Sequence, residues 1–159
     1  MLNLFKKSKS ETIFAPVDGI YVPLTAVNDP VFSQKMMGDG FGVQPNTTEI
    51  YAPIQGKITT IFQTKHAIGL ISPTGNEVLM HIGLDTVELA GHPFTIHVQE
   101  EQEVDETTLL ASVNFEEISS AGKDGIVLVL LTNSDEKIDS LEKTKVIHSE
   151  PLIKISVKK

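Results

Sequence analysis

Short β-prone runs separated by turn residues are the main pattern along the chain. Residues 57–71 and 77–84 are rich in Ile, Leu, Val and Thr, and they flank the segment Ser72-Pro-Thr-Gly-Asn76. Proline presets φ, and glycine and asparagine tolerate the positive φ of a tight reversal. The pattern therefore predicts a β-hairpin over these two runs.

The remaining hydrophobic runs have the same character. Residues 12–24, 108–115, 126–132 and 146–157 are β-prone, and Pro151 interrupts the last of them. Residues 116–123 and 135–142 are candidates for short helices. Because strands and helices do not alternate as in a βαβ fold, the pattern predicts an all-β, antiparallel domain with few short helices.

A short internal repeat adds to this prediction. The sequence Ala15-Pro-Val-Asp-Gly19 recurs as Ala52-Pro-Ile-Gln-Gly56, and a β-prone run follows each copy. Proline and glycine form a turn from which the strand begins. The repeat therefore favours a fold built from two related halves.

Length and composition narrow the possible functions. A chain of 159 residues suits one domain. The net charge of −8 and the absence of Arg disfavour nucleic-acid binding and favour a basic protein partner. The absence of Cys excludes disulfides, thiolate catalysis and cysteine zinc sites, and it fits a cytoplasmic location.

The chain ends and apolar runs predict one domain without stable membrane insertion. No apolar run is long enough to span a membrane. Residues 1–11 are expected to form a flexible lead, and residues 12–159 a single domain. The basic, apolar start at residues 1–9 lacks the features of a secretory signal. A frayed terminus is favoured there over a weak contact with a membrane surface.

Two histidines fall at mirror positions in the predicted hairpin. If the loop occupies residues 72–75, His66 lies directly opposite His81, with Cβ atoms about 4.5–5.5 Å apart. A register slip of one residue would send the two side chains to opposite faces. The pair is compatible with packed or solvated histidines, with a metal site, or with a phosphoryl site. Zinc would need further ligands, of which Asp85 is one candidate.

A phosphoryl site sets its own chemical requirements. The nucleophile must be neutral near pH 7, which imidazole is. A neighbouring donor should stabilise the equatorial oxygens of the transition state. Because Arg is absent, the second imidazole is the plausible donor. A hydroxyl two residues away on the same strand face can fix its tautomer.

Three segments carry a resemblance to a known family. The run Gly75-Asn-Glu-Val-Leu-Met-His-Ile-Gly-Leu-Asp-Thr-Val-Glu-Leu-Ala-Gly91 resembles the active-site signature of the glucose-type IIA component of the bacterial phosphoenolpyruvate-dependent sugar phosphotransferase system. Thr64-Lys-His-Ala67 resembles the second histidine segment of that family. Val31-Phe-Ser-Gln-Lys-Met-Met-Gly-Asp-Gly40 resembles its Val-Phe-x-x-Lys-x-x-Gly-Asp-Gly segment. The similarity runs from about residue 13 to the C-terminus.

The resemblance implies a fold and a set of roles. The fold would be an antiparallel β-barrel/sandwich with a duplicated hybrid motif. His81 would be phosphorylated, with His66 as the supporting histidine and Thr64 as the hydroxyl that orients it. The phosphocarrier protein HPr would donate the phosphoryl group, the IIB domain of a sugar permease would accept it, and no cofactor or metal would be needed. Partner contacts would come from Asp29, Val31, Phe32, Met36, Phe62, Leu79 and Asp85.

An acidic segment departs from the family pattern, and two further histidines lie outside the three segments. Residues 100–106 are acidic where the family has a Gly-rich, Lys-containing turn, and they are expected to form a solvated turn. His92 and His97 are expected at the surface.

The chain would act as a separate subunit or an excised domain. The alternatives are a zinc-dependent hydrolase built on His66, His81 and Asp85, or a regulatory binding module without turnover.

Overall fold

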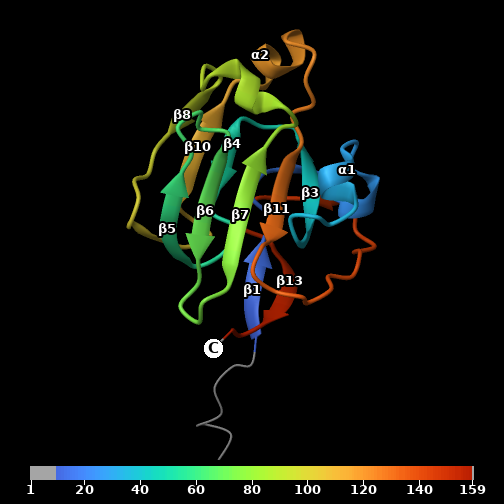
Figure 1. Ribbon diagram of the computed structural model, residues 1–159, viewed down its shortest axis with the longest axis vertical. Coiled ribbons are helices and arrows are strands. Elements are labelled where there is room, and N and C mark those ends of the chain that lie inside the picture. The colour runs from blue at the N-terminus through green and yellow to red at the C-terminus, as the bar shows by residue number, and fades with distance from the viewer. Residues whose placement is uncertain (1–9, 159) are drawn as a thin grey trace, which may run out of the picture.

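The computed structural model describes residues 10–158, which form antiparallel strands with two short α-helices (Figure 1). Residues 1–9 of the expected lead lie outside the described residues, and Ser10 and Glu11 belong to the first strand. The strands are β1 (Ser10–Phe14), β2 (Gly19–Pro23), β3 (Asp39–Pro45), β4 (Glu49–Tyr51), β5 (Gly56–Ile61), β6 (Ala67–Ile71), β7 (Glu77–Ile82), β8 (Phe94–Ile96), β9 (Glu103–Val104), β10 (Leu109–Val113), β11 (Val127–Leu131), β12 (Lys145–Val146) and β13 (Pro151–Ser156). The helices are α1 (Pro30–Ser33) and α2 (Phe115–Ser120), with 3-10 turns η2 (Leu24–Ala26) and η3 (Thr86–Leu89).

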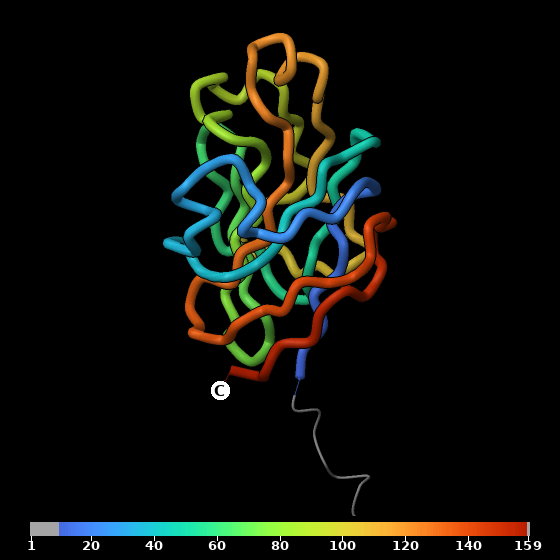
Figure 2. Tube along the Cα trace, turned by 90° about the vertical axis from the view of Figure 1, so that its right-hand side faces the viewer, coloured from blue at the N-terminus to red at the C-terminus, as the bar shows by residue number. Residues whose placement is uncertain are grey.

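The strands form three antiparallel sheets. The largest has eight strands in the order β12-β2-β3-β11-β7-β6-β5-β9, the second has the order β4-β10-β8, and β1 pairs with β13. The three-stranded sheet lies behind the β5–β6–β7–β11 part of the large sheet, and the turned view shows the same layers from the side (Figures 1 and 2). The predicted all-β antiparallel sandwich is confirmed, and its sheets do not close into a barrel.

Two hydrophobic clusters lie on opposite faces of β7 and β11. The main core contains Met80 and Ile82 from β7, whereas a smaller cluster contains Leu128 and Leu130 from β11 together with Phe32 of α1. Strand β11 is buried on both faces, as its continuous apolar sequence predicts. Residues alternate across a strand, so His81 lies on the face of β7 opposite Met80 and Ile82. Phe32 of α1 contacts His81 on this face.

The two copies of the internal repeat bond to each other. The Phe14 N–H donates to Pro53 O at 2.7 Å, and the Tyr51 N–H donates to Pro16 O at 2.7 Å. Each of these residues has its counterpart in the other copy of the repeat, so the two bonds are equivalent. The two copies of the repeat therefore lie side by side in the fold.

The hairpin over residues 57–84 differs from its prediction in two ways. The first run is not one strand, because the chain reverses at residues 62–66 and forms β5 and β6, with Lys65 in the left-handed region (φ 64°). The loop of the second hairpin also includes Asn76, so Ile71 pairs with Glu77 instead. Asn76 is held in the loop because Ser72 Oγ accepts its N–H at 3.0 Å, and its side-chain amide donates to Glu11.

The C-terminal third shows a second difference. The predicted helix at 116–123 is confirmed as α2, which the Asn114 side chain caps. The predicted helix at 135–142 is wrong, since no helix forms in that segment. Its backbone N–H groups are taken by side chains instead: Asp39 Oδ2 accepts from Ile138, and the Tyr21 hydroxyl accepts from Leu141. Pro151 begins β13 and does not interrupt a strand.

Helix length also bears on membrane contact. Among residues 10–158, no helix combines the length and the apolar character needed to cross a bilayer.

Candidate functional site

His66 and His81 meet in space, although the predicted register is wrong. His81 on β7 pairs with Ala67, and His66 lies one residue before β6 begins. The two ring centroids are nevertheless 5.0 Å apart, with an interplanar angle of 82°. Strand alternation does not fix the His66 side chain, because this residue follows Lys65 at the end of a turn. Its backbone oxygen still accepts from Ile82 N at 2.7 Å.

The backbone fixes the tautomer of His81. Its Nδ1 lies 2.8 Å from Gly83 O. A carbonyl oxygen can only accept, so Nδ1 carries the proton and Nε2 keeps its lone pair. Burial, together with the nearby His66, lowers the pKa of His81 to about 4, against the opposing effects of the Gly83 carbonyl and two carboxylates. His81 is therefore a neutral imidazole at pH 7.

The second imidazole is held by a hydroxyl. Thr64 Oγ1 lies 2.7 Å from His66 Nδ1. Burial lowers the pKa of His66, and only 6% of the residue is exposed. Thr64 lies in the turn between β5 and β6, whereas the sequence placed this hydroxyl on a strand face. The expected contact is present, but a turn supplies it.

The backbone conformation and close packing after β7 require a glycine at position 83. Its φ is 83°, and an added Cβ would lie 2.4 Å from Thr86 Cγ2 and 3.0 Å from Asp124 O. Thr86 is fully buried, and its hydroxyl donates to Ile82 O. A side chain at position 83 would therefore displace the carbonyl that holds His81. The hydrogen bond from His81 to the Gly83 carbonyl was not predicted from the sequence.

Aromatic rings flank both histidines. The Phe32 ring centroid is 4.9 Å from that of His81, and the Phe62 centroid is 5.5 Å from that of His66. Phe32 is only 7% exposed, so it packs beneath His81 and offers little surface to a partner. Asp29 caps α1, since its Oδ1 accepts from Val31 N at 2.9 Å.

The other expected partner contacts divide by exposure. Val31, Phe62 and Met36 are exposed, and Met36 is the most exposed at 69%. Asp85 is exposed, and its backbone has a left-handed conformation. Leu79 is partly buried against the smaller cluster. Val87 in η3 is an exposed apolar side chain as well. No hydrophobic periodicity in the sequence distinguishes it from a core residue.

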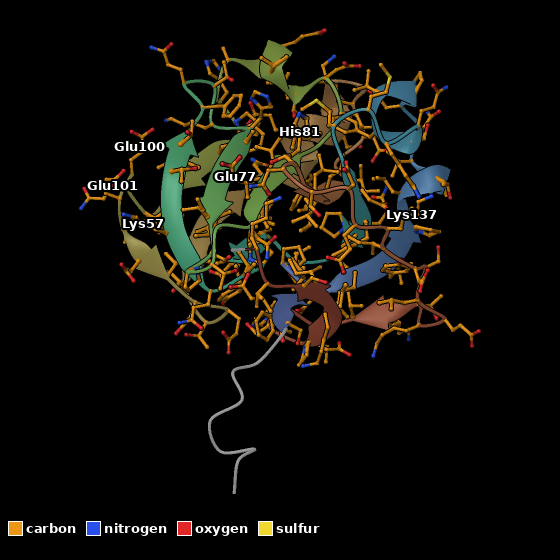
Figure 3. All side chains as sticks on the ribbon, turned by 60° about the horizontal axis from the view of Figure 1, so that its bottom comes forward. Lys57, Glu77, His81, Glu100, Glu101 and Lys137 are labelled. Atoms are coloured by element: carbon orange, nitrogen blue, oxygen red, sulfur yellow. The ribbon has the colours of Figure 1, made fainter. Side chains whose placement is uncertain are left out.

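The acidic segment 100–106 lies apart from this site. Lys57, Glu100 and Glu101 gather at the β5 edge, away from His81 (Figure 3). Glu101 forms an ion pair with Lys57 at 3.4 Å, and Glu100 accepts from Ile61 N at 3.0 Å. Residues 103 and 104 form the short strand β9, so the segment is only partly the solvated turn that was predicted. His92 and His97 are exposed, as expected.

The zinc alternative lacks a ligand set. Within residues 10–158, no three His, Asp or Glu side chains are grouped so that they could hold a metal ion. His66 and His81 are therefore left as a pair, with Nε2 of His81 as the available nucleophile.

Comparison with known proteins identifies the family. Residues 11–137 match the model of the family described as phosphoenolpyruvate-dependent sugar phosphotransferase system, EIIA 1. The chain is 48% identical over 139 residues to the "PTS system glucose-specific EIICBA component" of Streptococcus pneumoniae. That alignment covers 87% of this chain and 19% of the relative, so the chain spans about a fifth of the relative's length.

A solved structure is similar over almost the whole chain. The glucose permease IIA from Mycoplasma capricolum superposes with a TM-score of 0.84 at 32% identity, covering 92% of this chain and 96% of that one. The family match covers far more than half of the sequence and includes both histidines. The chain therefore belongs to the EIIA 1 family of the phosphoenolpyruvate-dependent sugar phosphotransferase system.

Proposed function

We propose that this protein carries a phosphoryl group on His81, accepting it from phosphorylated HPr and passing it to the IIB domain of a sugar permease. One observation carries the proposal. The Gly83 carbonyl holds Nδ1–H of His81, which leaves Nε2 as a neutral nucleophile, and the His66 ring lies beside that of His81 with the two centroids 5.0 Å apart. Residues 12–159 act as a single IIA domain in the cytoplasm.

The transfer is a displacement at phosphorus. The Nε2 lone pair of His81 forms a new N–P bond while the N–P bond of the donor phosphohistidine breaks, and that electron pair returns to the donor nitrogen. Nδ1 keeps its proton throughout, bonded to Gly83 O. The low pKa of His81 supports this step, because the ring needs no deprotonation before attack. In onward transfer a nucleophile of the IIB domain forms the new bond to phosphorus while the His81 Nε2–P bond breaks, and that electron pair returns to Nε2.

His66 stabilises the transferring group. Thr64 Oγ1 lies 2.7 Å from His66 Nδ1, and in the proposed mechanism the hydroxyl donates to Nδ1, so that the His66 proton is on Nε2. That N–H donates to the phosphoryl oxygens, where negative charge accumulates in the transition state. A neutral donor suits this position, since burial lowers the pKa of His66 and disfavours a cation there.

The surface around the histidines receives both protein partners. Val31, Met36 and Phe62 supply exposed apolar area, and flexible Met side chains adapt to different partners. Asp29 and Asp85 supply negative charge for a basic donor, in keeping with the net charge of −8. Phe32 and Leu79 support this surface from below.

The sugar is proposed from the relatives. The names of the Streptococcus pneumoniae and Mycoplasma capricolum proteins both refer to glucose. We therefore expect the IIB domain of a glucose permease to be the first acceptor to test.

The test is a reconstituted transfer reaction. The protein is incubated with phosphoenolpyruvate, the first enzyme of the system and HPr, and its mass is measured at neutral and acid pH. We expect one acid-labile phosphoryl group on the wild type and none on His81→Gln. Phosphoryl uptake by His81→Gln at the wild-type rate would contradict the proposal.

A further inference from the structure

The Gly83 carbonyl accepts from His81 Nδ1 at a point where a regular ladder bond of the β7–β11 pair is missing. At one end of the β7–β11 pairing, Thr132 N donates to Glu77 O at 3.0 Å; at the other end, Gly83 N donates to Ile126 O at 2.7 Å. In a hydrogen-bonded antiparallel pair, the two residues exchange both N–H···O bonds. The regular partner of Gly83 O would therefore be the Ile126 N–H.

Asp124 takes that N–H instead. The Ile126 N–H donates to Asp124 Oδ1 at 2.9 Å, which forms an Asx turn just before β11. The same oxygen accepts from Gln44 Nε2 on β3 at 2.9 Å. In addition, Asp124 O accepts from Leu84 N at 2.9 Å and so anchors the peptide group to which the Gly83 carbonyl belongs. The connection from α2 to β11 runs beside the end of β7 (Figure 1).

We infer that Asp124 is a positioning residue for His81, acting through Ile126 and Gly83. Its carboxylate accepts the Ile126 N–H, which would otherwise donate to Gly83 O and complete the ladder pair. The Gly83 oxygen is thereby left to accept from Nδ1–H of His81. The inference rests on the proposed function, because it is Nε2 of His81 that the arrangement leaves free for the phosphoryl group. Asp124 lies outside the three segments that resemble the family, so the inference adds a new side chain to the site.

Loss of the carboxylate has a defined consequence. Ile126 is 2% exposed, so without Asp124 its N–H would have to find another acceptor. The nearest regular acceptor is Gly83 O, which His81 now uses alone. Sharing this oxygen between two donors weakens its hold on Nδ1–H. The His81 proton can then move to Nε2, and that tautomer is not a nucleophile at Nε2.

The experiment measures the His81 tautomer by 15N NMR of histidine-labelled protein and, separately, the rate of phosphoryl uptake from HPr. For Asp124→Ala we expect a mixture of Nδ1–H and Nε2–H forms and an uptake rate lower by about tenfold. Asp124→Asn keeps an acceptor oxygen and should restore both readouts. The matched control is Asp105→Ala, because Asp105 Oδ1 accepts from Thr107 N at 2.9 Å in the same two-residue geometry. This control should behave as wild type.

An unchanged Nδ1–H tautomer in Asp124→Ala would overturn the inference, and so would failure of Asp124→Asn to restore it. If Asp124→Ala does not fold, Asp124→Ser carries the test. Its hydroxyl is a weaker acceptor in the same turn, so it should give an intermediate tautomer mixture, and a wild-type spectrum would overturn the inference. The tautomer is read without any phosphoryl donor. Failure of the proposed function, seen as uptake by His81→Gln, is therefore distinguishable from failure of this inference.

Discussion

His81 and His148 are both held through Nδ1, but by different partners. At His81 the partner is the Gly83 carbonyl, and at His148 it is the Asp18 carboxylate at 2.8 Å. Asp18 also accepts the His148 backbone N–H, which is the main cause of its lowered pKa. The His148 ring stacks on the Tyr51 ring with the two centroids 4.1 Å apart, whereas the His81 ring contacts the imidazole of His66.

The comparison bears on the role proposed for His81. An incoming phosphoryl group is negative, so a carboxylate bonded directly to the ring repels it, and a stacked Tyr51 offers no N–H to its oxygens. A neutral carbonyl fixes the same tautomer without that charge. The neighbouring His66 adds a donor. His81, unlike His148, therefore combines an uncharged partner at Nδ1 with a second imidazole beside it, as the proposed role requires.

The largest expected effect concerns the protonation of His81. With a pKa of about 4 in place of the ordinary 6.5, its proton affinity should be reduced by about 300-fold. The unfolded chain protonates this residue near pH 6.5, so it binds more protons than the folded chain between that pH and about 4. The stability contributed by His81 is therefore present above pH 6.5 and is lost as the pH falls toward 4. Histidine NMR titration checks the midpoint, and a value near 6.5 would show that the site is not desolvated.

The next effect separates the two imidazoles. His66→Gln should still take up the phosphoryl group from HPr, because the nucleophile is intact. Its onward transfer to the IIB domain should fall by about a hundredfold, as expected on loss of one transition-state donor. Rapid-quench measurement of each half-reaction tests this. Equal rates of onward transfer for the variant and the wild type would remove His66 from the mechanism.

The third effect tests the carbonyl that distinguishes His81 from His148. Gly83→Ala should destabilise the fold by about 2 kcal/mol, since it adds a clash with Thr86 to the cost of positive φ. Gly122→Ala is the matched control. Gly122 has φ 78° with no atom within 4 Å of an added Cβ, so only the conformational cost of about 1 kcal/mol applies. Urea unfolding compares the two variants, and equal losses would argue against a close-packed turn at Gly83.

The smallest effect is expected at the structural histidine. His148→Gln removes a half-exposed hydrogen bond to Asp18 and the stacking on Tyr51. We expect a loss of stability of at most about 1 kcal/mol and no change in phosphoryl uptake. Thermal unfolding and the reconstituted reaction check both expectations. A large fall in uptake would mean that the comparison between the two histidines is wrong.

The sequence predicted the architecture better than the details of the site. Turn residues and β-prone runs were sufficient to predict an antiparallel sandwich, and the two copies of the repeat lie side by side in it. The hairpin register was wrong by one residue because Asn76 joins the loop through bonds to Ser72 and Glu11, and Glu11 is far from Asn76 in sequence. The segment 135–142 was read as helical because its bonds to Tyr21 and Asp39 arise only in the folded chain.

The candidate site was likewise predicted only in part from the sequence. His66, His81 and Thr64 were predicted from their segments, and the structure brings all three together. The Gly83 carbonyl and the Asp124 carboxylate were not predicted as partners of this site. Backbone acceptors carry no side-chain signal, and Asp124 is distant from both histidines in sequence. Its relation to the site follows from the β7–β11 pairing alone.

The central claim is that Nε2 of His81 carries the transferable phosphoryl group. The most direct measurement is 15N–31P NMR of histidine-labelled protein phosphorylated through HPr, with His66→Gln and His148→Gln used to assign the signals. The account predicts one phosphoryl group, coupled to Nε2 of His81, while Nδ1 keeps its proton. A phosphoryl group coupled to Nδ1 of His81, or located on His66 or His148, would contradict it.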